Sequence, residues 1–135
     1  MQAQPYLMFE GRTEEALEFY KRALGAEIEA VMRYGDTPET SEHAPPGSKG
    51  KVMHSAFKIG DSMLMASDGQ CSGKTNFQGI SLALTVRNDS EAEQKFSALA
   101  DGGQIQMPLT KAFFASSFGL VADRFGVNWM VVTAQ

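Results

Sequence analysis

The chain has 135 residues, a length that fits one compact domain or two very small subdomains sharing a core. Hydrophobic residues make up 43% and charged residues 21%, a balance typical of globular rather than disordered proteins. The formal net charge is −4 and no run of Lys and Arg occurs, so a nucleic-acid-binding surface is not expected.

The composition also predicts the compartment. No apolar run approaches the roughly 20 residues that a membrane helix needs, so no membrane partner is expected. Residues 1–9 lack the charged start and the long apolar stretch of a signal peptide. The single cysteine, Cys71, has no partner for an intrachain disulfide. We therefore expect a protein of the reducing cytoplasm.

The beginning of the chain predicts a short strand followed by a helix. Residues 6–9 are predicted to form the strand, and Thr13 is predicted to be the N-cap residue of the helix. Gly25 is expected to end the helix, because glycine adopts the left-handed conformation at low cost. One face of this helix is apolar and carries Ala16, Tyr20, Ala23 and Leu24.

Three strands and a long loop are predicted next. Residues 27–34 alternate in polarity, which is typical of a half-buried strand. One side of this strand is predicted to carry Ile28, Ala30, Met32 and Tyr34. Residues 35–51 are polar and rich in Pro and Gly, so we interpret them as a loop and a candidate lid over a site. Residues 52–59 and 62–67 are predicted to form a hairpin.

After a polar linker at residues 68–77, the same order of elements returns. Ser90, with Glu93 three residues later, predicts the capping box of a second helix, which Gly102 and Gly103 would end. The apolar face of this helix carries Ala92, Phe96, Leu99 and Ala100. Four strands are predicted in this half, at residues 80–86, 104–109, 119–122 and 128–133.

The order βαβββ therefore occurs twice, and aligning the two helices places Ala16 on Ala92 and Tyr20 on Phe96. We predict an α+β fold with two βαβββ modules, at about residues 1–68 and 78–135, within one domain spanning residues 1–135. Each module has a single helix, which leaves one sheet face uncovered. Two modules can then curve a mixed sheet around a central cup, the natural place for a ligand.

Several segments together resemble the PhnB-like branch of the vicinal oxygen chelate superfamily (glyoxalase, bleomycin-resistance and dioxygenase proteins). The opening of that branch is similar to residues 5–11, 14–20 and 24–27, and its module-closing hairpin is similar to residues 59–68. Its C-terminal signature resembles residues 114–119 and 123–129, which include the Phe-Gly and Trp of that signature. The resemblance implies the glyoxalase fold, a homodimer and a cavity to which both modules contribute.

In catalytic relatives, the resemblance implies a divalent metal held by four side chains. The corresponding positions here are Pro5, Met65, Ser81 and Met130. None offers the imidazole or carboxylate that such cations need, and a Met thioether is a poor ligand for Mg, Mn or Zn. We therefore predict no metal centre and no cofactor.

The favoured hypothesis is a metal-independent binding protein that holds a small, partly apolar molecule in the cup. The candidate contacts are Met32, His54, Met65, Ser81, Phe114 and Met130. Methionine side chains adapt to varied ligands, and His54 and Ser81 would orient the molecule by hydrogen bonds.

Two other hypotheses stay open. An enzyme would need a metal-free mechanism, with His54 as the one plausible acid or base near the cup. A methyltransferase label is sometimes used for PhnB-like proteins, but residues 10–13 hold one glycine where a methyl-donor loop is Gly-rich. The third hypothesis is a dimerising structural or interaction protein with an occluded cup.

Three further motifs do not fit the chemistry that they suggest. Residues 69–75 resemble a phosphate-binding loop, but the glycine spacing is one short and a strand follows where a helix is needed. Cys71 has neutral neighbours and no histidine nearby, so we interpret it as an inert linker thiol. Ser116 and Ser117 lack the flanking glycines of a hydrolase elbow and are predicted in a loop before a strand.

Overall fold

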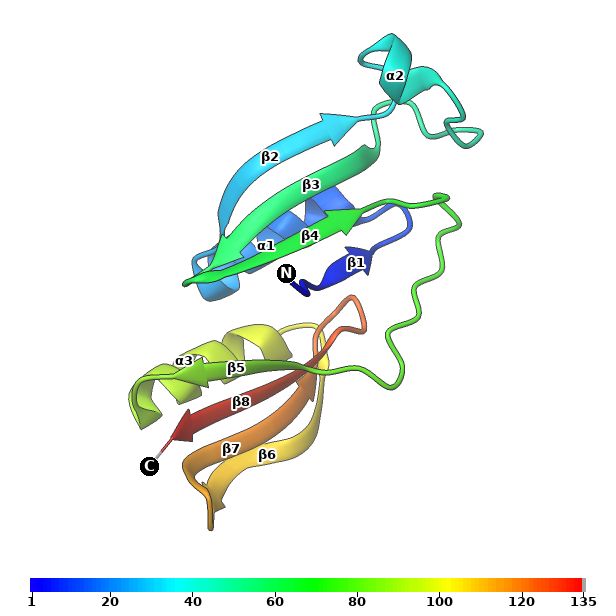
Figure 1. The fold of residues 1–135 in the computed structure, drawn as a ribbon. Coiled ribbons are helices and arrows are strands. Elements are labelled where there is room, and N and C mark those ends of the chain that lie inside the picture. Colours follow the sequence, from blue (N-terminus) through cyan, green and yellow to red (C-terminus); the bar gives the residue numbers. More distant parts are fainter. Residues whose placement is uncertain (135) are drawn as a thin grey trace. The chain divides into compact units, whose positions relative to one another are not determined.

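A computed structural model, in which residues 1–134 are described, shows two compact units, Met1–Thr75 and Asn76–Gln135. Each unit is a βαβββ module with a four-stranded mixed sheet (Figure 1). The predicted α+β class and the predicted repeat of element order are confirmed. Over residues 1–134, no helix is both long and apolar enough to cross a membrane.

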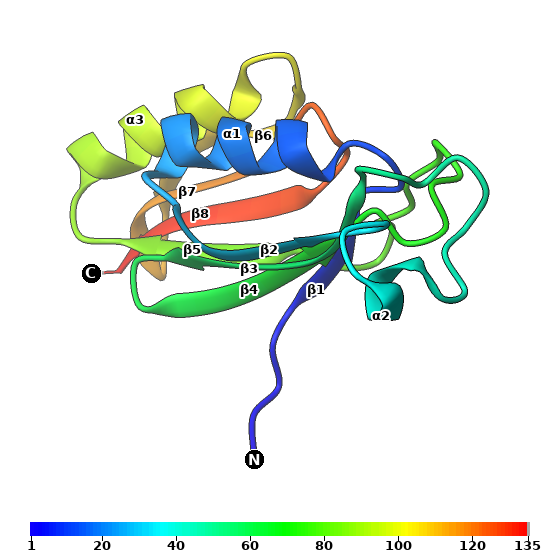
Figure 2. The same cartoon turned by 90° about the horizontal axis from the view of Figure 1, so that it is seen from above.

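The first unit has four strands, one long helix and one short helix. Its elements are β1 (Tyr6–Met8), α1 (Thr13–Leu24), β2 (Glu27–Arg33), α2 (Pro38–Ser41), β3 (Val52–Ile59) and β4 (Ser62–Ser67). The sheet order is β1-β4-β3-β2, with β1 parallel to β4 and the other pairs antiparallel. Helix α1 covers one face of this sheet, as Figure 2 shows. The buried ring of Tyr20 on α1 stacks on that of Phe57 on β3, with the ring centroids 6.1 Å apart.

Helix α1 ends as predicted but begins differently. Gly25 has a φ of 70° and donates its N–H to the carbonyl oxygen of Lys21 at 3.1 Å. Thr13 is the first helical residue, so the prediction that it is the N-cap is wrong. The capping oxygen comes from Asp68 at the end of β4, which accepts the N–H groups of Gly11 at 2.9 Å and Thr13 at 2.8 Å. The cap is distant in sequence, which explains the error.

Strand β2 differs from its predicted alternation because an extra residue bulges out of the ladder. Ile28 pairs with Phe57, whereas Ala30 pairs with the next residue, Ala56. This one-residue shift turns the following side chains to the other face of the sheet. The prediction that Ile28, Ala30 and Met32 share one side is therefore wrong, and most of β2 is exposed rather than half-buried.

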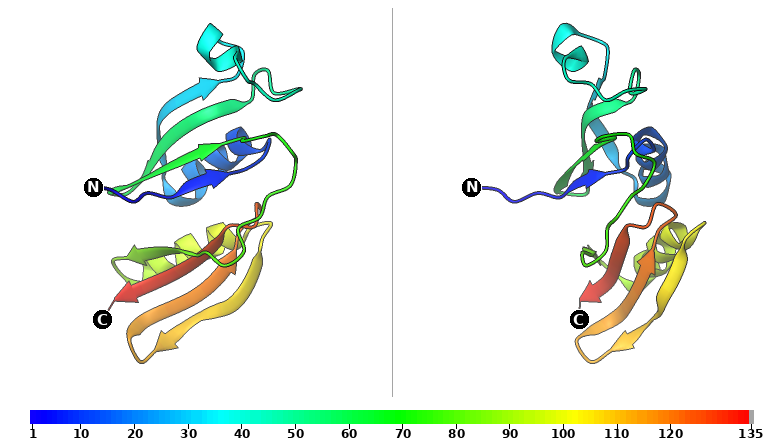
Figure 3. Two further views of the ribbon diagram at one scale, coloured as in Figure 1. Left: turned by 45° about the vertical axis from the view of Figure 1, so that its right-hand side comes forward. Right: turned by 90° about the vertical axis from the view of Figure 1, so that its right-hand side faces the viewer.

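The second unit repeats this plan with a longer hairpin. Its elements are β5 (Leu82–Val86), α3 (Asp89–Ala100), β6 (Gln104–Ala112), β7 (Ala115–Ala122) and β8 (Asn128–Ala134). The sheet order is β5-β8-β7-β6, with β5 parallel to β8. Figure 3 shows the β6–β7 hairpin in orange and yellow. Helix α3 buries Ala92, Phe96 and Leu99 against this sheet.

The start of α3 and the length of β7 correct two further predictions. Asn88 is the N-cap, and its Oδ1 accepts the N–H of Glu91 at 2.8 Å, so the capping box predicted at Ser90 and Glu93 is wrong. The side chain of Glu91 in turn accepts the N–H of Arg87 at 3.1 Å. Ser116 lies inside β7 rather than in a loop, because the strand begins four residues earlier than predicted.

Candidate ligand-binding site

The face of the first sheet opposite α1 is open and rich in methionine. Strand alternation and register place Tyr6 beside Met65, and Met32 beside His54, on this face. The side chains that share it include Tyr6, Met8, Met32, His54, Met63 and Met65. Met8 and Met32 are each 45% exposed and Tyr6 is 40% exposed. We call this set the methionine face.

One hydrogen bond connects the polar groups of the methionine face. The hydroxyl of Tyr6 on β1 lies 2.8 Å from Nδ1 of His54 on β3, so the contact spans β4 between them. The two ring centroids are 5.5 Å apart with an interplanar angle of 39°. Burial raises the pKa of the Tyr6 hydroxyl, which keeps the phenol protonated at neutral pH. The sequence predicted His54 but missed its partner.

The face of the second sheet opposite α3 is also apolar and open. Register places Leu120 beside Met130, and Phe118 beside Val132, on this face. Phe114, which precedes β7, packs edge-on against Phe118 with ring centroids 5.0 Å apart. Phe114 is 48% exposed.

The six predicted contact residues are distributed between the two units. Met32, His54 and Met65 lie on the methionine face of the first sheet. Met130 and Phe114 belong to the open face of the second sheet, and Ser81 is exposed directly before β5.

The four positions that correspond by resemblance to metal ligands carry neither an imidazole nor a carboxylate. The carbonyl oxygen of Pro5 accepts the N–H of Met65 at 3.0 Å, so these two positions are adjacent in the first unit. Neither side chain carries a nitrogen or oxygen donor. Across residues 1–134, no three His, Cys, Asp or Glu side chains come close enough to share a metal ion. The residues at these positions do not fit a hard divalent cation.

The loop between β1 and α1 does not fit a methyl donor either. Its N–H groups at Gly11 and Thr13 both point to Oδ1 of Asp68, at 2.9 and 2.8 Å. A nucleotide-like cofactor at a strand-to-helix turn binds through such backbone N–H groups, and here a buried carboxylate occupies them.

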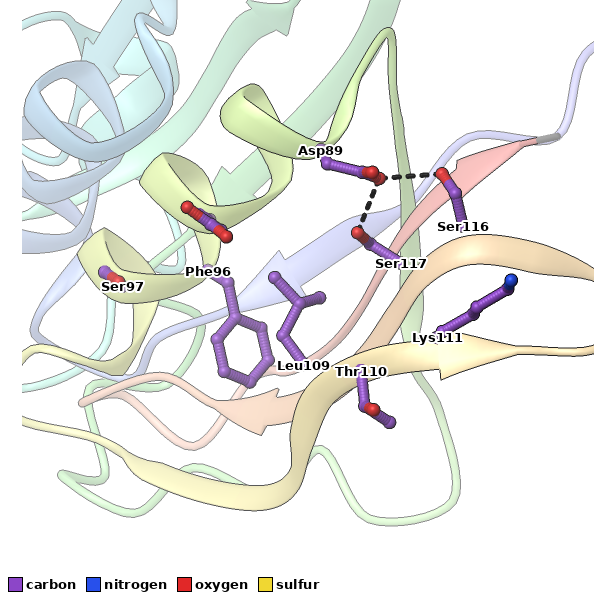
Figure 4. Close-up of a pocket in the computed structure, with 9 residues that line it drawn as sticks. Asp89, Phe96, Ser97, Leu109, Thr110, Lys111, Ser116 and Ser117 are labelled. Carbon is purple, nitrogen blue, oxygen red and sulfur yellow. Dashed lines mark hydrogen bonds between the residues drawn. The ribbon is translucent and has the colours of Figure 1, made fainter.

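The second unit holds a hollow of about 380 Å³ beside α3 and the β6–β7 hairpin (Figure 4). Its lining residues are Asp89, Glu93, Phe96, Ser97, Leu109, Thr110, Lys111, Ser116 and Ser117. Oδ1 of Asp89 accepts the hydroxyls of Ser116 at 2.7 Å and Ser117 at 2.6 Å. Two adjacent strand residues reach the same oxygen because the ladder bulges between Ala115 and Ser117. The sequence missed this cluster because the serines were assigned to a loop.

Acidification is expected to weaken the attachment of α3 at this cluster. The hydroxyls of Ser117 and Ser116 lower the pKa of Asp89. A carboxyl group whose pKa is lower in the folded state stabilises the fold above its unfolded pKa, and this contribution is lost as the pH falls through its folded pKa. Below about pH 4, the Tm of the wild type should therefore fall more steeply than that of Asp89→Asn.

Glu93→Gln is the matched control for this experiment, since Glu93 lines the same hollow without a hydrogen bond to either serine. Because the hydrogen bonds between Asp89 and the serines stay intact in this variant, its Tm should still fall more steeply in acid than that of Asp89→Asn. Parallel curves for the wild type and Asp89→Asn would contradict the role assigned to this carboxylate.

Two βαβββ units in one chain define the glyoxalase fold. A glyoxalase-related enzyme from Fulvimarina pelagi shares this fold, with a TM-score of 0.62 at 20% identity over 98% of this chain and 87% of that one. The family model of 3-demethylubiquinone-9 3-methyltransferase matches residues 1–132. The chain belongs to this family, the PhnB-like branch of the glyoxalase fold.

Several relatives are similar over almost their whole length. Protein YjdN of Escherichia coli is 35% identical over 97% of this chain and 94% of its own. The structure of PA1353 from Pseudomonas aeruginosa is 43% identical, with a TM-score of 0.86 over 100% of this chain and 98% of that one. A PhnB protein from Bacillus cereus is 32% identical, with a TM-score of 0.82 over 99% and 100%.

Proposed function

We propose that this protein binds a small, partly apolar molecule without the help of a metal ion. The observation that carries the proposal is the methionine face, an uncovered sheet surface with one hydrogen-bonded pair, Tyr6 and His54, among thioethers. Thioethers adapt to irregular apolar ligands, and a few fixed polar groups among apolar side chains are typical of small-molecule sites. An apolar surface left open on a sheet is itself a mark of a binding site.

Within this proposal, each predicted contact has a physical role. On the first unit, Met32 and Met65 supply apolar surface and His54 a hydrogen bond. On the second unit, Phe114 and Met130 supply apolar surface and Ser81 a hydrogen bond. The proposal also includes a homodimer in the cytoplasm, which rests on the family resemblance and on the composition. The methyltransferase description of the family does not enter it, since the β1–α1 loop presents no free N–H pair for a methyl donor.

Thermal-shift screening of a library of small aromatic and aliphatic compounds, in the presence of EDTA, tests the proposal. We expect some compounds to raise the Tm, because a ligand that binds only the folded state stabilises it. The variant Met32→Glu should lose this rise, since a carboxylate on the methionine face disfavours an apolar ligand.

Val31→Glu is the matched control, because Val31 neighbours Met32 on the same exposed strand. It pairs with Ser55, so its side chain lies on the opposite face of the sheet. It should keep the ligand-induced rise in Tm. A library without a single hit, or an equal loss of the rise in both variants, would refute the proposal.

A further inference from the structure

The hydrogen bond between Tyr6 and His54 joins a phenol hydroxyl to Nδ1 of the imidazole, so its direction and the tautomer of the ring go together. The phenol is protonated at neutral pH and is a strong donor, whereas its oxygen is a poor acceptor because its lone pair is delocalised into the ring. An imidazole nitrogen without a proton is a strong acceptor. On these strengths we assign the hydroxyl of Tyr6 as the donor to Nδ1 of His54 across 2.8 Å, an assignment that the tautomer of the ring decides. A neutral imidazole has one proton, which then resides on Nε2.

The Nε2–H group of His54 is a polar donor that the methionine face offers to a ligand. No residue of the described part of the chain accepts a hydrogen bond from it, and the ring is only partly buried. Its neighbour across the strands is the side chain of Met32. A thioether sulfur is a weak acceptor, so these surroundings leave the donor available.

The charges on this face decide between a neutral and an anionic acceptor. Lys58 shares the face but lies four residues along β3 from His54, about 13 Å away at 3.3 Å per residue. Its cross-strand neighbour on β2 is Glu27, an opposite charge. A carboxylate placed at His54 would exchange part of its hydration for contact with thioethers, with no cation of this face near enough to pair with it, which is unfavourable. A neutral carbonyl oxygen has no such penalty.

We propose that the ligand of the methionine face carries a neutral carbonyl oxygen, as in a ketone, ester or amide, which accepts the Nε2–H of His54. This inference rests on the proposed function and narrows it to one class of molecule. Tyr6 acts here as a positioning residue, since its hydroxyl holds the imidazole in the tautomer that donates to the ligand.

The test compares two probes that differ only in the acceptor, 1-tetralone and its deoxygenated counterpart tetralin. Their dissociation constants are measured by NMR titration of the full-length protein, and ¹⁵N shifts of the His54 ring report its tautomer. We expect the proton on Nε2 and about five-fold tighter binding of the ketone, the usual gain from one neutral hydrogen bond. In Tyr6→Phe, the ¹⁵N shifts should show a share of His54 rings with the proton on Nδ1, and the preference for the ketone over tetralin should fall below that of the wild type.

Tyr34→Phe is the matched control, because it removes a phenol hydroxyl that donates to the carbonyl oxygen of Gly69 instead. It should keep the five-fold ratio. Equal binding of ketone and hydrocarbon to the wild type would overturn the carbonyl inference and leave the proposed function intact. A ring proton on Nδ1 would also overturn it. Binding of neither probe to the methionine face would refute the proposed function as well.

Discussion

Replacing Asp68 by alanine is expected to lower the free energy of unfolding by about 4 kcal/mol. The carboxylate is 1% exposed and accepts three backbone N–H groups, those of Gly11 and Thr13 on Oδ1 and that of Val52 on Oδ2 at 2.8 Å. Its loss leaves buried donors without an acceptor, and each of these costs about 1–3 kcal/mol. Urea unfolding followed by circular dichroism measures the change.

Two further substitutions isolate this effect. Asp68→Asn keeps one oxygen for Gly11 and Thr13 but turns an amide N–H₂ toward Val52, so a smaller loss of about 2 kcal/mol is expected. Asp61→Asn makes the same chemical change in the exposed β3–β4 turn and should change stability by less than about 0.5 kcal/mol. If Asp68→Ala and Asp61→Asn unfold at the same urea concentration, Asp68 does not hold β1, α1 and β3 together.

Phe57→Ala should destabilise the protein by about 3–5 kcal/mol. The side chain of Phe57 is 0% exposed, and its ring stacks on that of Tyr20 with an interplanar angle of 8°. Alanine removes the ring and leaves a cavity between α1 and β3, because the surrounding strands relax only partly. Thermal and urea unfolding, followed by circular dichroism, give the change in stability.

Phe113→Ala removes the same ring from a position that is 95% exposed. It buries almost no surface, so the expected change is less than about 0.5 kcal/mol. Comparable losses for the two variants would show that the core of the first unit does not depend on the stack between Phe57 and Tyr20.

Local signals in the sequence predicted element ends better than element starts. The end of α1 at Gly25 depends on the conformation of one residue, which the amino-acid type itself favours. The start of α1 depends on Asp68, which is far away in sequence and lies beside the helix because β4 pairs with β1. A pattern confined to neighbouring residues contains no information on such a cap.

In the candidate site, too, local patterns predicted some residues and missed those that depend on contacts distant in sequence. Polarity alternation placed His54 on a strand face, and the family resemblance added Met65, but neither could find the hydroxyl of Tyr6 on the far side of β4. The bulge in β2 could not be predicted from the sequence either, because the shift in register depends on the strand with which β2 pairs. Ser116 and Ser117 were missed for the same reason, since their common direction toward Asp89 comes from a bulge.

The parallel pairing within each unit has a consequence for biosynthesis. Tyr6 pairs with Met65 and Leu82 with Trp129, so the earliest strand of each unit adds to the strand that leaves the ribosome last. The hairpins β3–β4 and β6–β7 need only nearby residues and can form first. Pairing strands that are so distant in sequence closes a long loop of chain, which is slow and entropically unfavourable. Until then, β1 and β5 have no neighbour of their own, and a nascent chain is most exposed to wrong strand pairing during that interval.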